Sequence, residues 1–199
     1  MTSSASASGP ASDGGGIATQ RSERDRPGAV RQGRIALAVL GLLSAAMLLF
    51  ALVSQYGFGL APCTLCHWQR WAHIAVIALA AAGLLAGRIG GRAAGPLQGV
   101  ALAAITLGFL AGAAIAGFHV GVELHWWEGT STCGSGGTPG SVDALKAQLM
   151  AQPLVRCDEV AFSVAGISMA GWNGIGSLLL ALAAAFAARR SLTARAPGG

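Results

Sequence analysis

The stretch IALAVLGLLSAAMLLFALVS, residues 35–54, decides the fold of this chain. It contains no charged side chain, and Leu, Ala, Val and Met make up most of it. A helix of this length is about 30 Å long, which matches the hydrocarbon thickness of a lipid bilayer. We therefore predict that this segment crosses a membrane as a helix.

Three further apolar runs follow, at residues 71–87, 97–118 and 172–188. Across all 199 residues, 53% are hydrophobic and only 11% are charged. A soluble domain carries about 25% charged residues, so this composition excludes an ordinary soluble domain. It also excludes disorder or a coiled coil for most of the chain. The sequence predicts an all-α membrane protein, a bundle of four transmembrane helices within residues 34–188.

The flanking segments differ from this bundle in composition. Residues 1–33 are rich in Ser, Ala, Gly and Pro, and such a segment buries too little apolar surface to order itself. We predict a disordered cytoplasmic tail there, and a short cytoplasmic tail at residues 189–199. The net charge is +5, but the basic residues lie beside apolar runs, so we predict no nucleic-acid partner.

The positive charges predict the orientation in the membrane. Most of the 13 Lys and Arg residues lie in the two tails and in the segment between the second and third apolar runs. Positively charged residues stay on the cytoplasmic side, so both termini should be cytoplasmic and residues 55–70 and 119–171 should form two loops on the outer side of the membrane. The basic residues on the predicted cytoplasmic side are Arg21, Arg24, Arg26, Arg31, Arg34, Arg88, Arg92, Arg189, Arg190 and Arg195.

The chain has four cysteines, and all of them fall in the two predicted outer loops. The outer side of a membrane is the oxidising side, where disulfides persist. Cys63 and Cys66 form a C-x-x-C motif, a spacing suited to a reactive dithiol. Cys133 and Cys157 are farther apart within the second loop, so they could close a larger ring.

Cys66 has informative neighbours. Pro62 precedes the motif, and a helix that begins near Cys66 would place its sulfur at the positive end of the helix dipole. Arg70 lies one turn deeper on the same face. Both features favour a thiolate at Cys66. An ionisable side chain at a membrane helix end indicates a functional role, although Arg70 could instead extend its charge to the interface as an anchor.

The cysteines have three other interpretations. Cys63-Thr64-Leu65-Cys66-His67 matches C-x-x-C-H, the attachment motif of c-type haem, with His67 as an axial ligand. The chain could also be a structural four-span membrane protein with two inert disulfides. A zinc site built from the four cysteines is not expected, because only one pair has ligand spacing, and we predict no metal ligands.

Several motifs together resemble the family of disulfide bond formation protein B, DsbB. The run from Cys63 to Arg70 is similar to that family's C-x-L-C-x-x-x-R signature, although some members have an acid at the position of Gln69. The likeness extends over residues 35–188. Its other parts are Phe118–Glu123, Trp126, Trp127 and Cys133, then Cys157, Phe162, Gly166 and Ser168–Asn173.

The resemblance implies a quinone-dependent thiol oxidase of the bacterial inner membrane. A periplasmic DsbA-like dithiol oxidase would reduce a Cys133–Cys157 disulfide, with Cys133 forming the mixed disulfide. Electrons would pass to Cys63–Cys66 through a transient Cys63–Cys157 bond, and from Cys66 to a membrane quinone, ubiquinone or menaquinone. All four cysteines would therefore be catalytic.

The resemblance also implies the residues that bind the quinone. Cys66 would meet the ring and Arg70 would offset the negative charge that develops there. His119, at the end of the third helix, matches a quinone-proximal histidine of the family, although a structural role beside Glu123 is also open.

Residues 141–150 should form a short helix in the second loop, either on the membrane surface, as in the family, or packed on the loop itself.

Overall fold

Four long helices form most of the structure. It is a computed structural model that describes residues 14–130, 133, 141–143, 146 and 155–193. All four helices are long and apolar enough to cross a membrane, with candidate spans at Gly28–Phe58, Thr64–Ile89, Gly91–Glu123 and Met169–Thr193. The prediction of an all-α membrane protein with four spans is confirmed. The helices are α1 (Gly14–Phe58), α2 (Thr64–Ile89), α3 (Ala94–Glu123) and α5 (Met169–Thr193), with a 3-10 turn η1 (Gly91–Ala93) before α3.

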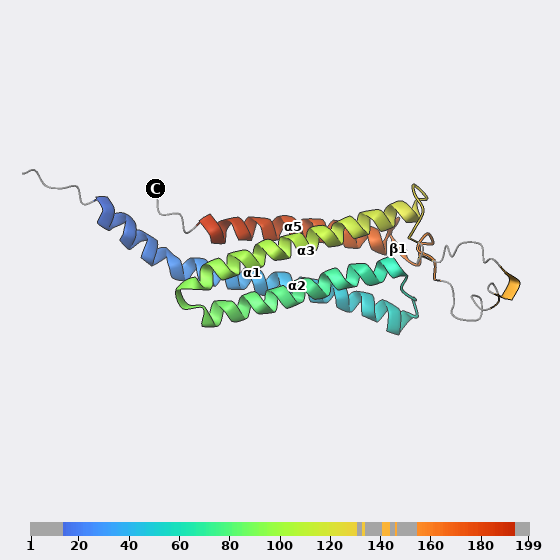
Figure 1. The fold of residues 1–199 in the computed structure, drawn as a ribbon, viewed down its shortest axis with the longest axis horizontal. Coiled ribbons are helices and arrows are strands. Elements are labelled where there is room, and N and C mark those ends of the chain that lie inside the picture. Colours follow the sequence, from blue (N-terminus) through green and yellow to red (C-terminus); the bar gives the residue numbers. More distant parts are fainter. Residues whose placement is uncertain (1–13, 131–132, 134–140, 144–145, 147–154, 194–199) are drawn as a thin grey trace, which may run out of the picture.

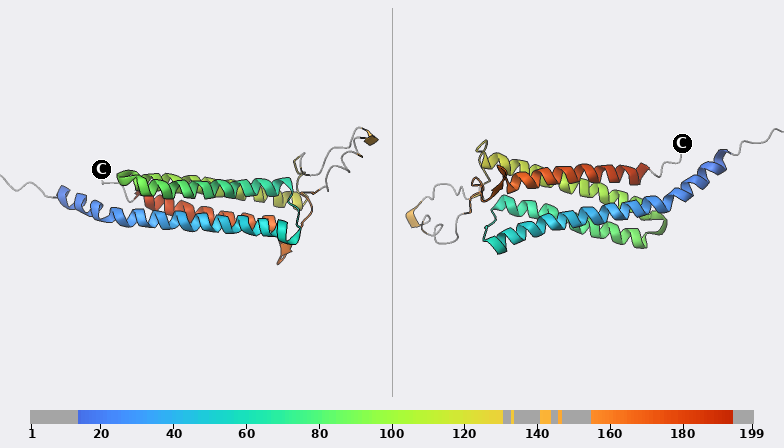
Figure 2. Two further views of the ribbon diagram at one scale, coloured as in Figure 1. Left: turned by 90° about the horizontal axis from the view of Figure 1, so that it is seen from below. Right: turned by 180° about the vertical axis from the view of Figure 1, so that it is seen from behind.

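The helices lie side by side along one axis as a bundle (Figure 1). Helix α3 packs against both α5 and α2, and α1 closes the bundle by packing on α2 and α5. The views in Figure 2 show that the links from α1 to α2 and from α3 to α5 lie at the same end of the bundle. We call it the cysteine end, because residues 59–63, 124–130, 133 and 155–168, with most of the cysteines, belong to it.

Small residues let the helices approach closely in the core. A side-chain carbon added at Gly83 would lie 2.8 Å from the Ala101 side chain on α3 and 2.9 Å from Leu37 on α1. One added at Gly41 would lie 2.9 Å from Ala80. Such small-residue contacts are typical of membrane bundles, in which close packing replaces the hydrophobic effect between helices. The buried core contains Leu37, Leu40, Val76, Ala80, Leu102, Ile105, Phe109, Ala181, Ala184 and Ala188.

The helix bounds extend beyond the predicted ones. Helix α1 begins at Gly14, so residues 14–33 are helical where the sequence predicted a disordered tail. Adding a residue to an existing helix costs much less than starting one, and the apolar segment provides that start. Helix α1 also continues to Phe58 and α2 begins at Thr64, so the predicted loop 55–70 is reduced to residues 59–63.

The second connection contains a short hairpin that the sequence analysis did not predict. Strand β1 (Ser163–Val164) pairs antiparallel with β2 (Ile167–Ser168). The two residues between the strands, Ala165 and Gly166, have φ values of 52° and 78°, as a tight hairpin turn with two left-handed positions requires. The helix predicted for residues 141–150 falls largely outside the described residues.

Candidate functional site

The C-x-x-C motif forms the start of α2. Cys63 is the N-cap, and its Sγ accepts a hydrogen bond from the Cys66 backbone N–H at 3.3 Å. The two Sγ atoms are joined by a hydrogen bond of 3.2 Å. That hydrogen bond is the main cause that lowers the pKa of Cys63 far below the ordinary thiol value, against the opposing effect of burial. The geometry therefore favours Cys63 as the thiolate, whereas the sequence analysis favoured Cys66.

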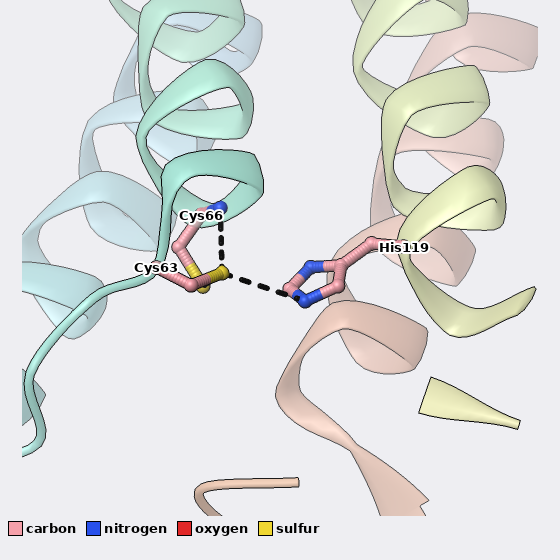
Figure 3. Close-up of side chains that lie close together, drawn as sticks. All are labelled: Cys63, Cys66 and His119. Atoms are coloured by element: carbon pink, nitrogen blue, oxygen red, sulfur yellow. Dashed lines mark hydrogen bonds between the residues drawn. The ribbon is translucent and has the colours of Figure 1, made fainter. Parts of the chain in front are cut away.

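His119 reaches this pair from the last turn of α3 (Figure 3). Its Nε2 lies 3.5 Å from Cys63 Sγ and 3.9 Å from Oε1 of Glu123, one helical turn further on. His119 is buried, with 3% of its surface exposed. Its imidazole faces the sulfur of Cys63, so a hydrogen on Nε2 can be donated to a thiolate there.

Two amide side chains hold the other side of the His119 ring. Gln69 Nε2 lies 2.9 Å from His119 Nδ1, and Asn173 Nδ2 on α5 donates to Gln69 Oε1. Because Gln69 uses its oxygen for Asn173, its NH2 group donates to Nδ1 of His119. The hydrogen of a neutral imidazole then lies on Nε2, directed at Cys63 Sγ.

The hydrogen-bonded chain continues into the bundle. Asn173 Oδ1 lies 2.8 Å from Nε2 of His73, and His73 Nδ1 lies 2.9 Å from Oγ of Ser44 on α1. His73 and Ser44 are buried. From His73 outward, every member donates to the next, and the series ends at the sulfur of Cys63. Ser44 Oγ also donates to the backbone carbonyl of His73 at 3.2 Å. Polar groups inside a membrane bundle are costly unless they are paired. These hydrogen bonds give each of the polar side chains in the series a partner.

Arg70 lies on the same helix and bridges to α1. One guanidinium nitrogen donates to Gln55 Oε1, and the other donates to the Ala51 carbonyl at 3.2 Å. The planar guanidinium group matches two acceptors at once, which a lysine ammonium cannot reproduce. Arg70 thus has fixed partners at the cysteine end and does not simply extend into the interface.

The second cysteine pair packs against the first. Cys133 and Cys157 form a disulfide and are 3% and 0% exposed. They belong to one buried cluster with Cys63, Leu65 and Val122, and Cys66 packs at its edge. The structure therefore brings all four predicted catalytic cysteines together, with the outer pair oxidised and the inner pair reduced.

An apolar cavity of about 760 Å³ opens beside the inner pair. Cys63, Cys66, Arg70 and His119 line it, so it includes all of the predicted quinone-binding residues. This volume is in the usual range for small-molecule sites, which are mostly apolar with a few directed polar groups. Its apolar wall comes largely from α1 and α5, including Leu43, Met47, Phe50, Leu179 and Leu180.

Sequence reasoning missed part of this site. The sequence analysis assigned a functional role to none of Ser44, His73 and Asn173. A signal was present, because a Ser, a His and an Asn within or beside apolar membrane segments are expected to point into a bundle. The haem interpretation fits the structure poorly, because His67 is exposed and His119 is the histidine beside the sulfurs.

Comparisons with known proteins identify the family of this chain. The family model described as "Disulfide bond formation protein DsbB" matches residues 33–187. The chain is 33% identical to disulfide bond formation protein B of Chromohalobacter salexigens over 161 residues, covering 77% of this chain and 87% of that protein. It is 35% identical to the protein of that name from Xanthomonas oryzae pv. oryzae, covering 77% of this chain and 91% of that protein. No solved structure matched the chain. The chain therefore belongs to the DsbB family of disulfide bond formation proteins.

Proposed function

We propose that this membrane protein is a dithiol:quinone oxidoreductase that reoxidises a periplasmic DsbA-like thiol oxidase. In this proposal the cysteine end faces the periplasm, and both termini are in the cytoplasm of a bacterial cell. The observation that carries it is the placement of two cysteine pairs, one oxidised and one reduced, against a single apolar cavity at one end of the bundle. A structural protein with inert disulfides needs no such cavity beside a reduced pair.

The first step is thiol–disulfide exchange at the outer pair. A thiolate of the partner attacks Cys133 and releases Cys157 as a thiolate. The second partner thiolate then displaces Cys133, so the partner leaves with its own disulfide and both cysteines are reduced. When the inner pair is a disulfide, the Cys157 thiolate attacks Cys63, which forms a transient Cys63–Cys157 bond and releases Cys66 as a thiolate. Cys133 then attacks Cys157, which restores the Cys133–Cys157 disulfide and leaves both inner cysteines reduced. The packing of Cys63 and Cys157 in one cluster supports this route.

The second step is reoxidation of the inner pair. The cavity fits a quinone head group, since it combines a long apolar wall with polar groups at one end. A quinone bound there would supply a two-electron, two-proton acceptor. His119 Nε2 donates to the Cys63 thiolate and stabilises its charge, while Arg70 supplies a fixed positive charge at the same end of the cavity.

The cysteine requirement tests this proposal. Each cysteine is replaced by Ser, and quinone reduction is followed with a reduced DsbA-like protein as the donor. We expect all four variants to lose steady-state activity with that donor. A small dithiol donor should still support Cys133→Ser and Cys157→Ser, because it can reduce the inner pair directly. Full activity of either variant with the protein donor would contradict the relay.

The orientation needs a separate test. Spheroplasts are treated with a reductant and then with a thiol reagent that cannot cross the membrane. We expect Cys133 or Cys157 to be labelled in intact spheroplasts. Labelling that requires lysis would place the cysteine end in the cytoplasm, where disulfides are not maintained.

A further inference from the structure

We propose that the reduced Cys63–Cys66 pair and His119 together bind one Zn²⁺ ion, which reversibly blocks the inner dithiol. The consequence of binding rests on the proposed function, because an ion held here would stop the reoxidation of the inner pair. The binding itself is independent of that function. The sequence predicted no metal ligands, since only one cysteine pair had suitable spacing, but the fold adds a histidine from another helix.

The positions of the three ligand atoms fit a tetrahedral ion. The two sulfurs and the imidazole nitrogen lie within 4.8 Å of one another, with 3.2 Å between the sulfurs and 3.5 Å from Cys63 Sγ to His119 Nε2. Zinc bonds of about 2.3 Å to sulfur and about 2.0 Å to nitrogen place ligand atoms roughly 3.5 to 3.8 Å apart. To hold the ion, the two sulfurs must separate slightly and Cys66 Sγ, which lies within 4.8 Å of the imidazole nitrogen, must come to the same distance from it as Cys63 Sγ.

The charges also favour a divalent ion. Two thiolates and one Zn²⁺ have no net charge, so the buried site avoids holding unpaired charges. Glu123 Oε1 lies 3.9 Å from His119 Nε2, close enough to become a fourth ligand or to accept a hydrogen bond from a metal-bound water. Ser168 donates to the other carboxylate oxygen of Glu123 and holds it in place.

The hydrogen-bonded chain behind His119 can support either state. A zinc ion on Nε2 requires the ring hydrogen on Nδ1, which then needs an acceptor. Gln69 can provide one by turning its amide, so that Oε1 faces Nδ1 and the NH2 group donates to Asn173 Oδ1. The Asn173 amide turns as well, so that its Nδ2 donates to Nε2 of His73, and the hydrogen of His73 moves to Nδ1, which donates to Ser44 Oγ. Every member both donates and accepts, so the chain can reverse its direction without losing a bond.

The ion binds only the reduced inner pair. In the oxidised state the two sulfurs are joined to each other and offer no thiolates. Binding therefore traps the state that must be reoxidised, and zinc should inhibit turnover until a chelator removes it. Thiolate and imidazole ligands select Zn²⁺ over Mg²⁺ and Ca²⁺, which prefer oxygen.

The test measures binding directly, with no quinone or donor present. The full chain carrying Cys133→Ala and Cys157→Ala is purified in detergent, reduced and titrated with Co²⁺, whose absorption reports thiolate ligands and tetrahedral geometry. Zn²⁺ affinity is then obtained by competition. We expect one ion per chain, with loss of the thiolate absorption in Cys63→Ser. The disulfide-intact chain, with its inner pair selectively reduced, should bind one ion as well.

Histidine variants distinguish this site from a bare dithiol. His119→Ala should weaken Zn²⁺ binding by more than about 100-fold, whereas His67→Ala, the matched control next to Cys66, should leave it unchanged. Gln69→Leu, which removes the acceptor for Nδ1, should weaken binding by about 10–100-fold. Gln69→Glu should tighten it, because a carboxylate is the stronger acceptor. Equal binding by His119→Ala and the parent, or dependence on His67, would overturn the site.

The two proposals fail in different ways. Turnover with a DsbA-like donor that Zn²⁺ does not slow, together with absent Co²⁺ binding, would overturn the metal site and leave the proposed function intact. Tight Zn²⁺ binding in a chain that does not turn over would refute the proposed function alone. A zinc ion that copurifies with the protein and leaves only on unfolding would overturn reversible inhibition, since it would be structural.

Discussion

Asn173 joins two parts of the buried polar chain, so its removal should have a measurable cost. Its Nδ2 donates to Gln69 and its Oδ1 accepts from His73 at 2.8 Å. Hydrogen bonds between membrane helices contribute on average about 0.6 kcal/mol and at most about 1.7 kcal/mol each. The loss of two such bonds in Asn173→Ala should lower the free energy of unfolding by about 1–3 kcal/mol. The change should also increase the rotational freedom of Gln69 and of the His119 ring that Gln69 orients.

The measurement is unfolding in mixtures of a mild and a denaturing detergent, followed by circular dichroism. Ser177 provides a matched control, because it is buried one turn along the same helix and its Oγ lacks a partner among the described residues. Ser177→Ala should be neutral or slightly stabilising. A double-mutant cycle with His73→Ala should give a coupling of about 0.6–1.7 kcal/mol. The reasoning fails if Asn173→Ala costs no more than Ser177→Ala, or if the coupling is indistinguishable from zero.

Three further changes test other parts of the structure. Gln98→Leu should stabilise the bundle in the same assay by about 1–3 kcal/mol, because Gln98 is fully buried with neither amide atom paired among the described residues; destabilisation would mean that the amide has a partner. In Cys66→Ala the pKa of Cys63 should rise, since its main hydrogen-bond donor is lost, so the pH profile of Cys63 alkylation should shift to higher pH; an unshifted profile would refute Cys63 as the stabilised thiolate. Arg70→Lys should raise the quinone KM in steady-state assays, because one ammonium cannot replace the guanidinium that joins Gln55 and the Ala51 carbonyl. A single-turnover burst with the donor should remain in that variant, and an unchanged KM would reduce Arg70 to an anchor.

Local properties of the sequence were enough to determine the fold class. An apolar run such as residues 35–54 must satisfy its backbone hydrogen bonds internally, so a membrane makes it a helix whatever its neighbours are. The existence of all four spans followed from this constraint. Their ends did not, because helix ends depend on particular caps. The start of α2 at Thr64, for example, depends on the Cys63 side chain as a cap.

Spacing and chemistry also identified most of the site. The C-x-x-C motif, Arg70 and the two distant cysteines are visible as residue types at recognisable positions. Resemblance then supplied the roles that spacing could not. The sequence alone placed the thiolate at Cys66, because it could show a helix start nearby but not which sulfur would accept the hydrogen bonds.

The partners of each side chain were decided only by the tertiary structure. His119 is far from Cys63 in sequence, and its Nε2 reaches that sulfur because α3 packs against α2 with one particular rotation and offset. Small residues such as Gly83 let the two helices approach closely, and these contacts set the offset between them. The spacing of hydrophobic residues along the sequence does not show which small residues make such contacts. The same packing aligns Ser44, from a third helix, with His73. Hydrogen bonds depend on direction and on fractions of an ångström, so a buried chain of them is determined only when all of the helices are in place.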